Sequence, residues 1–433
     1  MREVIKNAKE QIAKITNNDE ECISVTNSLS FDRDDVIFVD DKGKTVVNIV
    51  QQTYTDINGK NIRLMDGVKI PAFSSVQLNF GEEKESHIKP FNYDDNTLTT
   101  PFAKVQFDEN GLISSFIDTV AQRELVSEMP FNTFLMAEDV PTSWDNWDID
   151  ADIEMKFKPC ATLIERDVVS SGEVAFIIRS KYKISEKSTI TQDMIFFANS
   201  PEVRFDTYMD WQDDHRFLKT AFDTDVREDF ARHEIQFGYC KRPTTRNNSI
   251  EQAKFEVVNH KYTDLSEPNY GVTLMNDCKY GISVNGSQIS LSLHKGGTHP
   301  DVKGDKGLHH AVYSFMPHNC AFNAESVIHP AYKLNIPHIV SDGAFEIKSL
   351  VNVDKANIIV ESIKPCEDED KAFVVRLYEA EGTRTNSVIT LNDSIIKYAV
   401  TNMLEEEIDS IVDGNILNTQ FRPFEIKTIK AYY

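Results

Sequence analysis

Ten residues in the middle of the chain combine aromatic rings with carboxylates. The segment PTSWDNWDID, residues 141–150, holds Trp144 and Trp147, each followed directly by an aspartate, Asp145 and Asp148. The chain has only three tryptophans, so two of them in one short segment point to a special role. Sugars bind where an aromatic face meets their C–H surface and carboxylates accept hydrogen bonds from their hydroxyls. The segment is therefore either a carbohydrate-facing surface or a loop that its two tryptophans anchor.

Two further segments carry histidines among acidic residues. In DWQDDHRFLKTAFDTDV, residues 210–226, His215 is either a general base oriented by Asp213 or Asp214, or the end of a strand with satisfied hydrogen bonds. The segment HKGGTHPDVKGDKGLHH, residues 294–310, contains His294, His299, His309 and His310. Their spacing matches no template for metal ligands, so we expect a polar loop there and assign no metal ligand.

Charge and missing motifs exclude several classes of function. The chain has 433 residues, with 46 Lys and Arg against 69 Asp and Glu, which gives a formal net charge of −23. So acidic a surface repels phosphates, so we expect neither nucleic acid nor an anionic membrane as a partner. The sequence lacks GxGxxG, GxxxxGK[ST], GxSxG and HExxH, which argues against nucleotide binding and the corresponding hydrolases.

Apolar runs and cysteine spacing bear on location. No apolar run approaches the roughly 20 residues that span a bilayer, and residues 1–15 lack the apolar centre of a signal peptide. The six cysteines are far apart and form no CxxC pair. This pattern favours reduced thiols, and the predicted location is cytoplasmic.

The elements that must position these residues are predicted to be β-strands. Short runs of β-branched and aromatic residues alternate with polar turns from residue 23 to the end, as in FAKVQFDENGLISSFID, residues 102–118. There Asn110 and Gly111 supply the turn of a hairpin. The alternation of strands and helices that builds barrels and doubly wound sheets is missing. The predicted fold is all-β, with several antiparallel sandwiches and one short N-terminal helix.

Breaks in the strand pattern divide the chain into four parts. Residues 1–18 have apolar residues at helical spacing and are predicted to be the last helix of a larger helical unit. Residues 19–92 are predicted to form a small sandwich, and residues 93–345 a large central one. Residues 346–433 repeat the pattern as a C-terminal sandwich.

Several segments, taken in order, resemble the C-terminal half of glycoside hydrolase family 38 α-mannosidases, most closely the bacterial and cytosolic subgroup. The similarity extends from about residue 19 to residue 433, and its order along the chain makes it specific. It implies that the large sandwich is a galactose-mutarotase-like supersandwich. The segments that carry it are VTNSLSFDRDDVIFV, FAKVQFDENGLISSFID, FLMAEDVPTSWDNWDID, DWQDDHRFLKTAFDTDV, FGYCKRPTTRNNS, YTDLSEPNYGVTLMNDCKYG, VVRLYEAEG and FRPFEIKTIK.

The resemblance implies a retaining, zinc-dependent hydrolase of α-mannosides. In the family, the nucleophile and the zinc ligands belong to an N-terminal catalytic domain, and no residue of this chain matches them. We therefore assign no catalytic residue, expect zinc in the complete enzyme and not on this chain, and expect the chain alone to be inactive. The implied partners are a mannose-containing oligosaccharide and the N-terminal catalytic domain of the same enzyme. Self-association into a homo-oligomer is compatible with the family.

The resemblance also gives the aromatic, acidic segment a place. The large sandwich of the family contributes to the wall of the sugar cleft, so Trp144, Asp145, Trp147 and Asp148 are the substrate-binding candidates. Two alternatives stay open. The chain could be a stand-alone carbohydrate-binding sandwich, or a mutarotase-like epimerase in which His215 or His294 faces a carboxylate across an open sheet.

Overall fold

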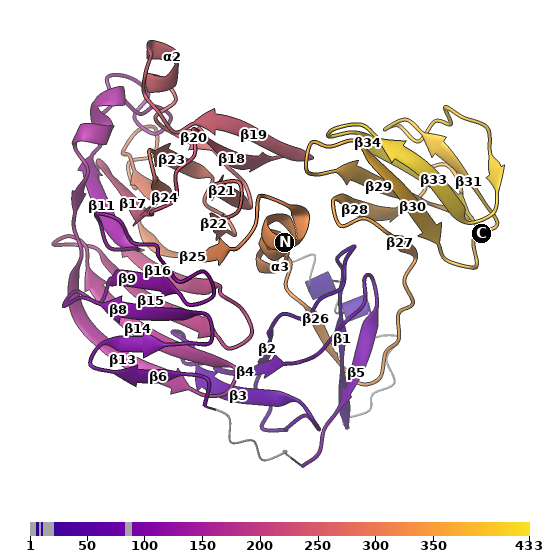
Figure 1. Cartoon of the computed structure of the whole chain (residues 1–433), viewed down its shortest axis with the longest axis horizontal. Coiled ribbons are helices and arrows are strands. Elements are labelled where there is room, and N and C mark those ends of the chain that lie inside the picture. The colour runs from indigo at the N-terminus through magenta and orange to yellow at the C-terminus, as the bar shows by residue number, and fades with distance from the viewer. Residues whose placement is uncertain (1–5, 8–9, 12–20, 83–88) are drawn as a thin grey trace.

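Figure 1 shows a computed structural model of the chain, which describes residues 6–7, 10–11, 21–82 and 89–433. The strands form antiparallel sheets, and short helices interrupt them. The predicted all-β class, with sandwiches arranged around a large central one, is confirmed. The predicted helix over residues 1–18 lies for the most part outside the described residues, and those described there, 6–7 and 10–11, are helical.

The N-terminal strands form a small sandwich of two three-stranded sheets, with the strand orders β2-β4-β3 and β26-β1-β5. Strand β1 is buried along its whole length because it pairs with β5 on one side and with β26 on the other. The predicted range of the large sandwich, 93–345, includes β26, whereas the hydrogen bonds of β26 join it to β1. The strands are Cys22–Thr26 (β1), Ile37–Asp40 (β2), Val50–Thr55 (β3), Asn61–Asp66 (β4), Ser75–Asn79 (β5) and Ile339–Asp342 (β26).

The large central sandwich contains sheets of nine, six and five strands. The nine-stranded sheet has the order β13-β14-β15-β16-β25-β22-β21-β18-β19. Its strands are Thr162–Ser171 (β13), Ala175–Lys183 (β14), Thr189–Phe197 (β15), Val203–Trp211 (β16), Phe230–Ile235 (β18), Gly238–Pro243 (β19), Tyr262–Ser266 (β21), Gly271–Asn276 (β22) and Gly307–His318 (β25).

The other two sheets complete this sandwich. The six-stranded sheet has the order β12-β11-β17-β24-β23-β20 and the five-stranded sheet the order β10-β9-β8-β7-β6. The six strands are Thr133–Glu138 (β11), Lys158–Pro159 (β12), Arg216–Asp223 (β17), Val257–Val258 (β20), Gly281–Asn285 (β23) and Gln288–Gly296 (β24). The five are Asn92–Asp94 (β6), Thr97–Thr99 (β7), Ala103–Phe107 (β8), Ile113–Asp118 (β9) and Arg123–Glu124 (β10).

A phenylalanine cluster fills the space between these sheets. Alternate residues of β16 are buried, as expected for a strand with one face on the core, and its last residue, Trp211, is wholly buried. Phe315 of β25 lies with its ring centroid 4.8 Å from that of Phe131 and 5.4 Å from that of Phe222. Because these rings come from distant parts of the sequence, their packing holds the sheets together.

The last strands form a C-terminal sandwich from sheets ordered β27-β30-β33 and β28-β29-β34-β31-β32. In Figure 1 this sandwich is the yellow part of the chain, to one side of the large one. Its strands are Val351–Val353 (β27), Ile358–Pro365 (β28), Ala372–Glu379 (β29), Thr385–Leu391 (β30), Lys397–Thr401 (β31), Val412–Asp413 (β32), Ile416–Phe421 (β33) and Ile426–Tyr432 (β34). Within residues 89–433, the helices are Ala151–Met155 (η1), Ser249–Gln252 (α2), Ala324–Ile328 (η2) and His329–Asn335 (α3).

The helical segment η2–α3 joins the three sandwiches. Tyr332 of α3 is buried and exchanges a hydrogen bond of 2.8 Å with Tyr378 of the C-terminal sandwich. Arg33 of the small sandwich is buried, forms an ion pair with Asp35 and donates to the carbonyl of Ile336 at 2.7 Å. The segment therefore lies between the sandwiches and contacts them, and Figure 1 shows α3 at this central position.

We expect the substitution Phe315→Ala to destabilise the large sandwich by about 3–5 kcal/mol, because it leaves a cavity among the stacked rings. Phe230→Ala is the matched control, since the Phe230 side chain is 47% exposed, and it should change stability by less than about 0.5 kcal/mol. Urea unfolding followed by tryptophan fluorescence measures both, because buried Trp211 reports on this sandwich. Equal unfolding midpoints for the two variants would contradict the packing described above.

Candidate functional site

The two tryptophans of the segment 141–150 are exposed. Trp144 is 67% exposed and Trp147 70%, and their ring centroids lie 6.1 Å apart at 41°. A tight turn presents them, in which the carbonyl of Trp144 accepts hydrogen bonds from the N–H groups of Trp147, at 2.7 Å, and Asp148, at 2.9 Å. Burial of these rings therefore does not anchor the loop. They form an aromatic pair that faces solvent.

The carboxylate of Asp145 holds the loop in place. Its Oδ2 accepts hydrogen bonds from the N–H of Thr298 at 2.7 Å and the N–H of His299 at 3.0 Å. The same oxygen lies 3.2 Å from Nε2 of His215 and 3.2 Å from Oγ1 of Thr298. Burial alone would raise the pKa of Asp145, but the Thr298 hydrogen bond and the His215 contacts outweigh it and lower the pKa. Asp145 is thus ionised at neutral pH and ties the loop to residues 298–299.

Lys295 forms a second tie from the neighbouring strand β24. Its ammonium group donates to the carbonyl of Asp145 at 2.6 Å and to that of Asp148 at 2.8 Å, and it forms an ion pair of 2.8 Å with Asp139. These contacts satisfy loop carbonyls with a single cation. Nothing in the local sequence indicated Lys295 or Thr298, because each lies about 150 positions away from the residues that it holds.

His215 has a different partner from the two that the sequence suggested. Asp213 accepts hydrogen bonds from Ser185 and Ser188, and Asp214 forms an ion pair of 2.7 Å with Lys306. The backbone of His215 has a φ of +50°, in the left-handed region, and this turn directs its ring to Asp145 instead of to its neighbours. The acidic residues next to His215 in the sequence are therefore not its partners in the structure.

An open hollow of about 580 Å³ lies beside the aromatic pair. Asn146 and Trp147 of the loop line it, together with Glu256, Ser292 and Lys295. Glu256 accepts hydrogen bonds from Lys219 and Ser292, so its charge is balanced. An aromatic rim above several hydrogen-bonding groups is the arrangement that binds sugars.

The histidines of residues 294–310 do not gather into a metal site. His294 packs against Trp211, at 4.7 Å between ring centroids, and burial lowers its pKa to about 3. His310 stacks on Tyr208 and lies 2.6 Å from Asp206. Among the described residues, no group of three or more His, Cys, Asp or Glu side chains is placed to hold a metal ion. The residues of the described chain thus do not fit a zinc ion, and we derive no step through one.

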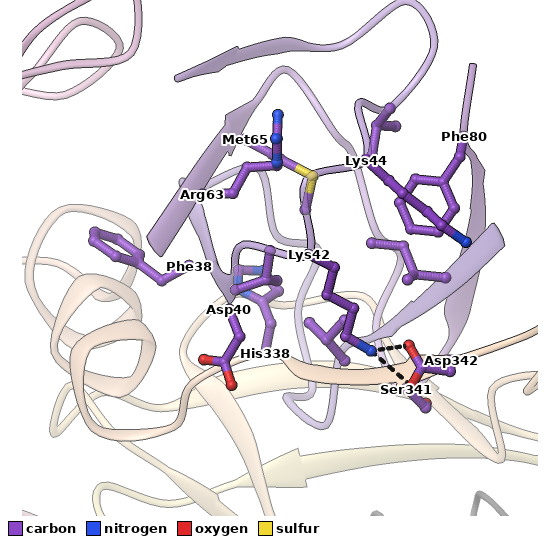
Figure 2. A pocket seen from close by; sticks show the side chains of 14 residues that line it. Phe38, Asp40, Lys42, Lys44, Arg63, Met65, Phe80, His338, Ser341 and Asp342 are labelled. Carbon is purple, nitrogen blue, oxygen red and sulfur yellow. Dashed lines mark hydrogen bonds and ion pairs between the residues drawn. The ribbon is translucent and has the colours of Figure 1, made fainter. Parts of the chain in front are cut away.

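A second cleft, of about 390 Å³, opens between the two sheets of the small sandwich (Figure 2). Figure 2 shows Phe38 and Phe80 on opposite sides of it and an ion pair between Lys42 and Asp342 at its mouth. The two side chains of this pair are 53% and 70% exposed, so it contributes at most about 1 kcal/mol. Because its aromatic rings stand apart and these charges neutralise each other, this cleft matches a sugar less well than the loop 141–150 does.

Comparison with known families agrees with this architecture. The model "Glycosyl hydrolases family 38 C-terminal domain" matches residues 98–303. The model "Glycosyl hydrolases family 38 C-terminal beta sandwich domain" matches residues 357–429. The two matches together span more than half of the chain and follow the order of the large and C-terminal sandwiches. The chain belongs to glycosyl hydrolase family 38.

Its curated relatives are α-mannosidases. Alpha-mannosidase 2C1 of Homo sapiens is 33% identical over 347 residues, which are 77% of this chain and 33% of that protein. Alpha-mannosidase G of Dictyostelium discoideum is 33% identical over 356 residues, which are 78% of this chain and 32% of that protein. The chain thus spans about a third of the length of the curated relatives that it matches.

A solved structure shares the fold. The crystal structure of an alpha-mannosidase from Enterococcus faecalis superposes with a TM-score of 0.77 at 14% identity. The superposition covers 99% of this chain and 58% of that one. Separately, no helix within the described residues has the length and apolar character needed to cross a bilayer.

We expect Asp145→Asn to loosen residues 297–305 by about 1–3 kcal/mol, because the N–H groups of Thr298 and His299 lose a charged acceptor. Asp148→Asn is the matched control, since the Asp148 side chain bonds only within its own loop, to the N–H of Ile149. Hydrogen exchange at pH 7, followed by mass spectrometry of peptides from residues 294–310, should be faster in the first variant alone. Equal exchange in both variants would contradict the role of Asp145 in holding residues 298–299.

The hydrogen bonds between Asp145 and residues 298–299 should weaken in acid. Because the folded-state pKa of Asp145 is lowered, its contribution is complete above the usual carboxyl pKa of about 3.9 and is lost as pH falls through the lower folded value. We expect the fluorescence of exposed Trp144 and Trp147 to change in that range in the parent chain. In Asp145→Asn this transition should be absent, and an identical transition in both proteins would contradict the assignment.

Proposed function

We propose that this chain is the C-terminal, carbohydrate-facing half of an α-mannosidase. Family membership supports the reaction class, and the curated relatives, of which the match covers about a third, are named as α-mannosidases. In the complete enzyme, the zinc ion and the catalytic residues belong to an N-terminal catalytic domain, and the substrate is a mannose-containing oligosaccharide. We place the protein in the cytoplasm.

The observation that carries the proposal is a solvent-facing pair of tryptophans on a loop held by charged hydrogen bonds. Large aromatic side chains in contact with water lose the free energy that their burial would supply. Asp145 and Lys295 nevertheless hold Trp144 and Trp147 in this position from distant elements. A loop fixed in advance loses less conformational entropy when a ligand binds, which is the property of a binding surface.

The four candidate residues have different roles in this proposal. Trp147, at the rim of the hollow, and Trp144 beside it stack against sugar rings. Asp148 is exposed and accepts a hydrogen bond from a sugar hydroxyl. Asp145 acts through the loop, because four groups already contact its Oδ2. Asn146 and Lys295 offer further polar contacts inside the hollow.

The mutarotase-like alternative has less support. His294 is packed between aromatic rings, and its low pKa makes it a poor base at neutral pH. His215 does contact a carboxylate, but that of Asp145 is engaged by the backbone of residues 298–299. The other alternative is a stand-alone carbohydrate-binding sandwich. The turnover experiment below distinguishes it from our proposal.

The first test measures sugar binding by the chain as it is. Titration with an α-linked mannobiose should change the emission of the exposed tryptophans, while buried Trp211 supplies a constant background. We expect Trp147→Ala to weaken binding about fivefold, since stacking on an aromatic face contributes on the order of 1 kcal/mol. Leu404→Ala is the control, because Leu404 is equally exposed but lies in the C-terminal sandwich. Unchanged affinity in Trp144→Ala and Trp147→Ala would contradict the site.

The second test measures turnover of an aryl α-mannoside, with and without added zinc. We expect no turnover by the chain alone. A chimaera that places the N-terminal two thirds of Alpha-mannosidase G before this chain should turn over the substrate, and Trp147→Ala should lower its kcat/KM. Turnover by the chain alone, with zinc bound in a one-to-one ratio, would refute the assignment of the chemistry to another domain.

A further inference from the structure

A polar cluster around Cys320 lies apart from the carbohydrate site. Cys320 belongs to the short connection between β25 and η2, where the large and C-terminal sandwiches meet. Cys320 is partly exposed as a residue, and the flanking residues Asn319 and Ala321 are exposed. Just beyond it, the N–H of Ala324 donates to Glu381 of the C-terminal sandwich at 2.6 Å. The cysteine is therefore accessible and sits at the joint between two sandwiches.

Three side chains converge on the sulfur atom of Cys320. The amide of Asn323 donates to Sγ at 3.2 Å, and Oγ of Ser326 lies 3.1 Å from it. Nδ1 of His318 lies 3.6 Å from the same atom. Asn323 is fixed in this position because its side-chain oxygen caps η2 by accepting the N–H of Ser326 at 2.9 Å. Asn323 and Ser326 can thus donate hydrogen bonds to the sulfur, and the His318 ring lies beside it.

The contacts of His318 define the protonation of its ring. Nε2 lies 3.0 Å from a carboxylate oxygen of Asp264, and Nδ1 lies 3.0 Å from the carbonyl oxygen of Cys320. Both oxygens accept hydrogen bonds, so the imidazolium form, with a proton on each ring nitrogen, is the form that satisfies both contacts. Burial opposes this charge, but the hydrogen bond and the negative charge of Asp264 outweigh it and raise the pKa of His318.

The charged groups around His318 come from two strands. Asp264 of β21 is wholly buried, accepts a hydrogen bond of 2.6 Å from Ser266 and lies 3.6 Å from Nη1 of Arg232 on β18. Strand β22 brings the uncharged Gly271 against the imidazole, so close that a Cβ there would lie 2.5 Å from the ring. Glu325 of η2 is exposed and its charge acts on Glu381. These contacts hold the ring of His318 in one orientation.

An imidazolium and two hydrogen-bond donors stabilise a negative charge on sulfur. Burial alone would raise the pKa of the Cys320 thiol, but the contacts with Ser326, His318 and Asn323 outweigh it and lower the pKa. Two other cysteines behave in the opposite way, since burial raises the pKa of Cys160 and of Cys278 to about 12. Cys320 therefore combines access to solvent with the surroundings that activate a thiol.

We propose that Cys320 is a reactive thiolate and the site at which hydroperoxides modify this chain. The sulfur attacks one peroxide oxygen, and an S–O bond forms as the O–O bond breaks. Sulfur loses two electrons and becomes a sulfenic acid, while the peroxide is reduced. The leaving group is hydroxide from hydrogen peroxide or an alkoxide from an organic hydroperoxide, and it takes a proton, from His318 or from solvent, and leaves as water or an alcohol.

The first test measures the rate of alkylation by iodoacetamide between pH 5 and pH 9 on the folded chain, with each cysteine followed by peptide mass spectrometry. Cys278, which is exposed as a residue but has a raised pKa, is the internal reference. We expect the Cys320 rate to have its midpoint below the value of about 8.5 for a free thiol, and to exceed the Cys278 rate at least tenfold at pH 7. A midpoint at or above that of a free thiol would overturn the proposal.

Two variants separate activation of the thiol from a structural role of the cluster. Asn323→Asp keeps a good N-cap for η2 but replaces the amide donor with a carboxylate, and Ser326→Ala removes the second donor. We expect the midpoint of Cys320 alkylation to rise by roughly one pH unit in Asn323→Asp, with the thermal midpoint of the fold unchanged. An unchanged alkylation profile in both folded variants would refute the activation.

The second test uses hydrogen peroxide with dimedone present to trap sulfenic acid. The dimedone adduct should form on Cys320 before any other cysteine, and more slowly in Asn323→Asp. First labelling of Cys278 or of Cys160 would overturn the proposal. Neither test depends on mannoside binding or turnover, so its outcome is independent of the function proposed above.

Discussion

One partly buried carboxylate determines the surface on which the proposed function depends. Asp145 connects the loop 141–150 to residues 298–299, which are about 150 positions away along the chain. The loop can therefore expose two tryptophans without collapsing onto the sheet beneath it. Charged hydrogen bonds are stronger and more directional than apolar contacts, so they can fix a loop while leaving its aromatic rings in water. Lys295 adds a second tie from the same neighbouring region.

The rest of the molecule supplies the rigid frame that this tie requires. The partners of Asp145 lie beside strands of the six-stranded sheet, because His215 directly precedes β17 and residues 298–299 come just after β24. That sheet packs on the phenylalanine core around Phe315. The η2–α3 segment links the core to the small and C-terminal sandwiches through Tyr332 and the Arg33–Asp35 pair. Dense packing of this kind transmits position well, because cores have little free volume.

A carboxylate contacts a histidine at two places in the structure, with different chemical consequences. At Asp145, a carboxylate receives hydrogen bonds and a histidine contact, and the result is a fixed loop. At Asp264, a buried carboxylate holds His318 as a cation, and the result is a charge beside the sulfur of Cys320. In both places, a carboxylate contacts a histidine that is distant in the sequence. The two places differ in the other neighbour of the histidine, which is Thr298 for His215 and Cys320 for His318.

Local sequence determined the strand content, the all-β class and the family resemblance, because alternation of buried and exposed residues along a strand is a short-range pattern. It also singled out Trp144 and Trp147, whose residue type alone marks them. The pairing of β26 with β1, the contact of His215 with Asp145 and the gathering of His318, Asn323 and Ser326 around Cys320 needed the tertiary structure. These partners depend on long-range strand pairing and on backbone turns, such as the positive φ of His215, and neither leaves a periodic signal in the sequence.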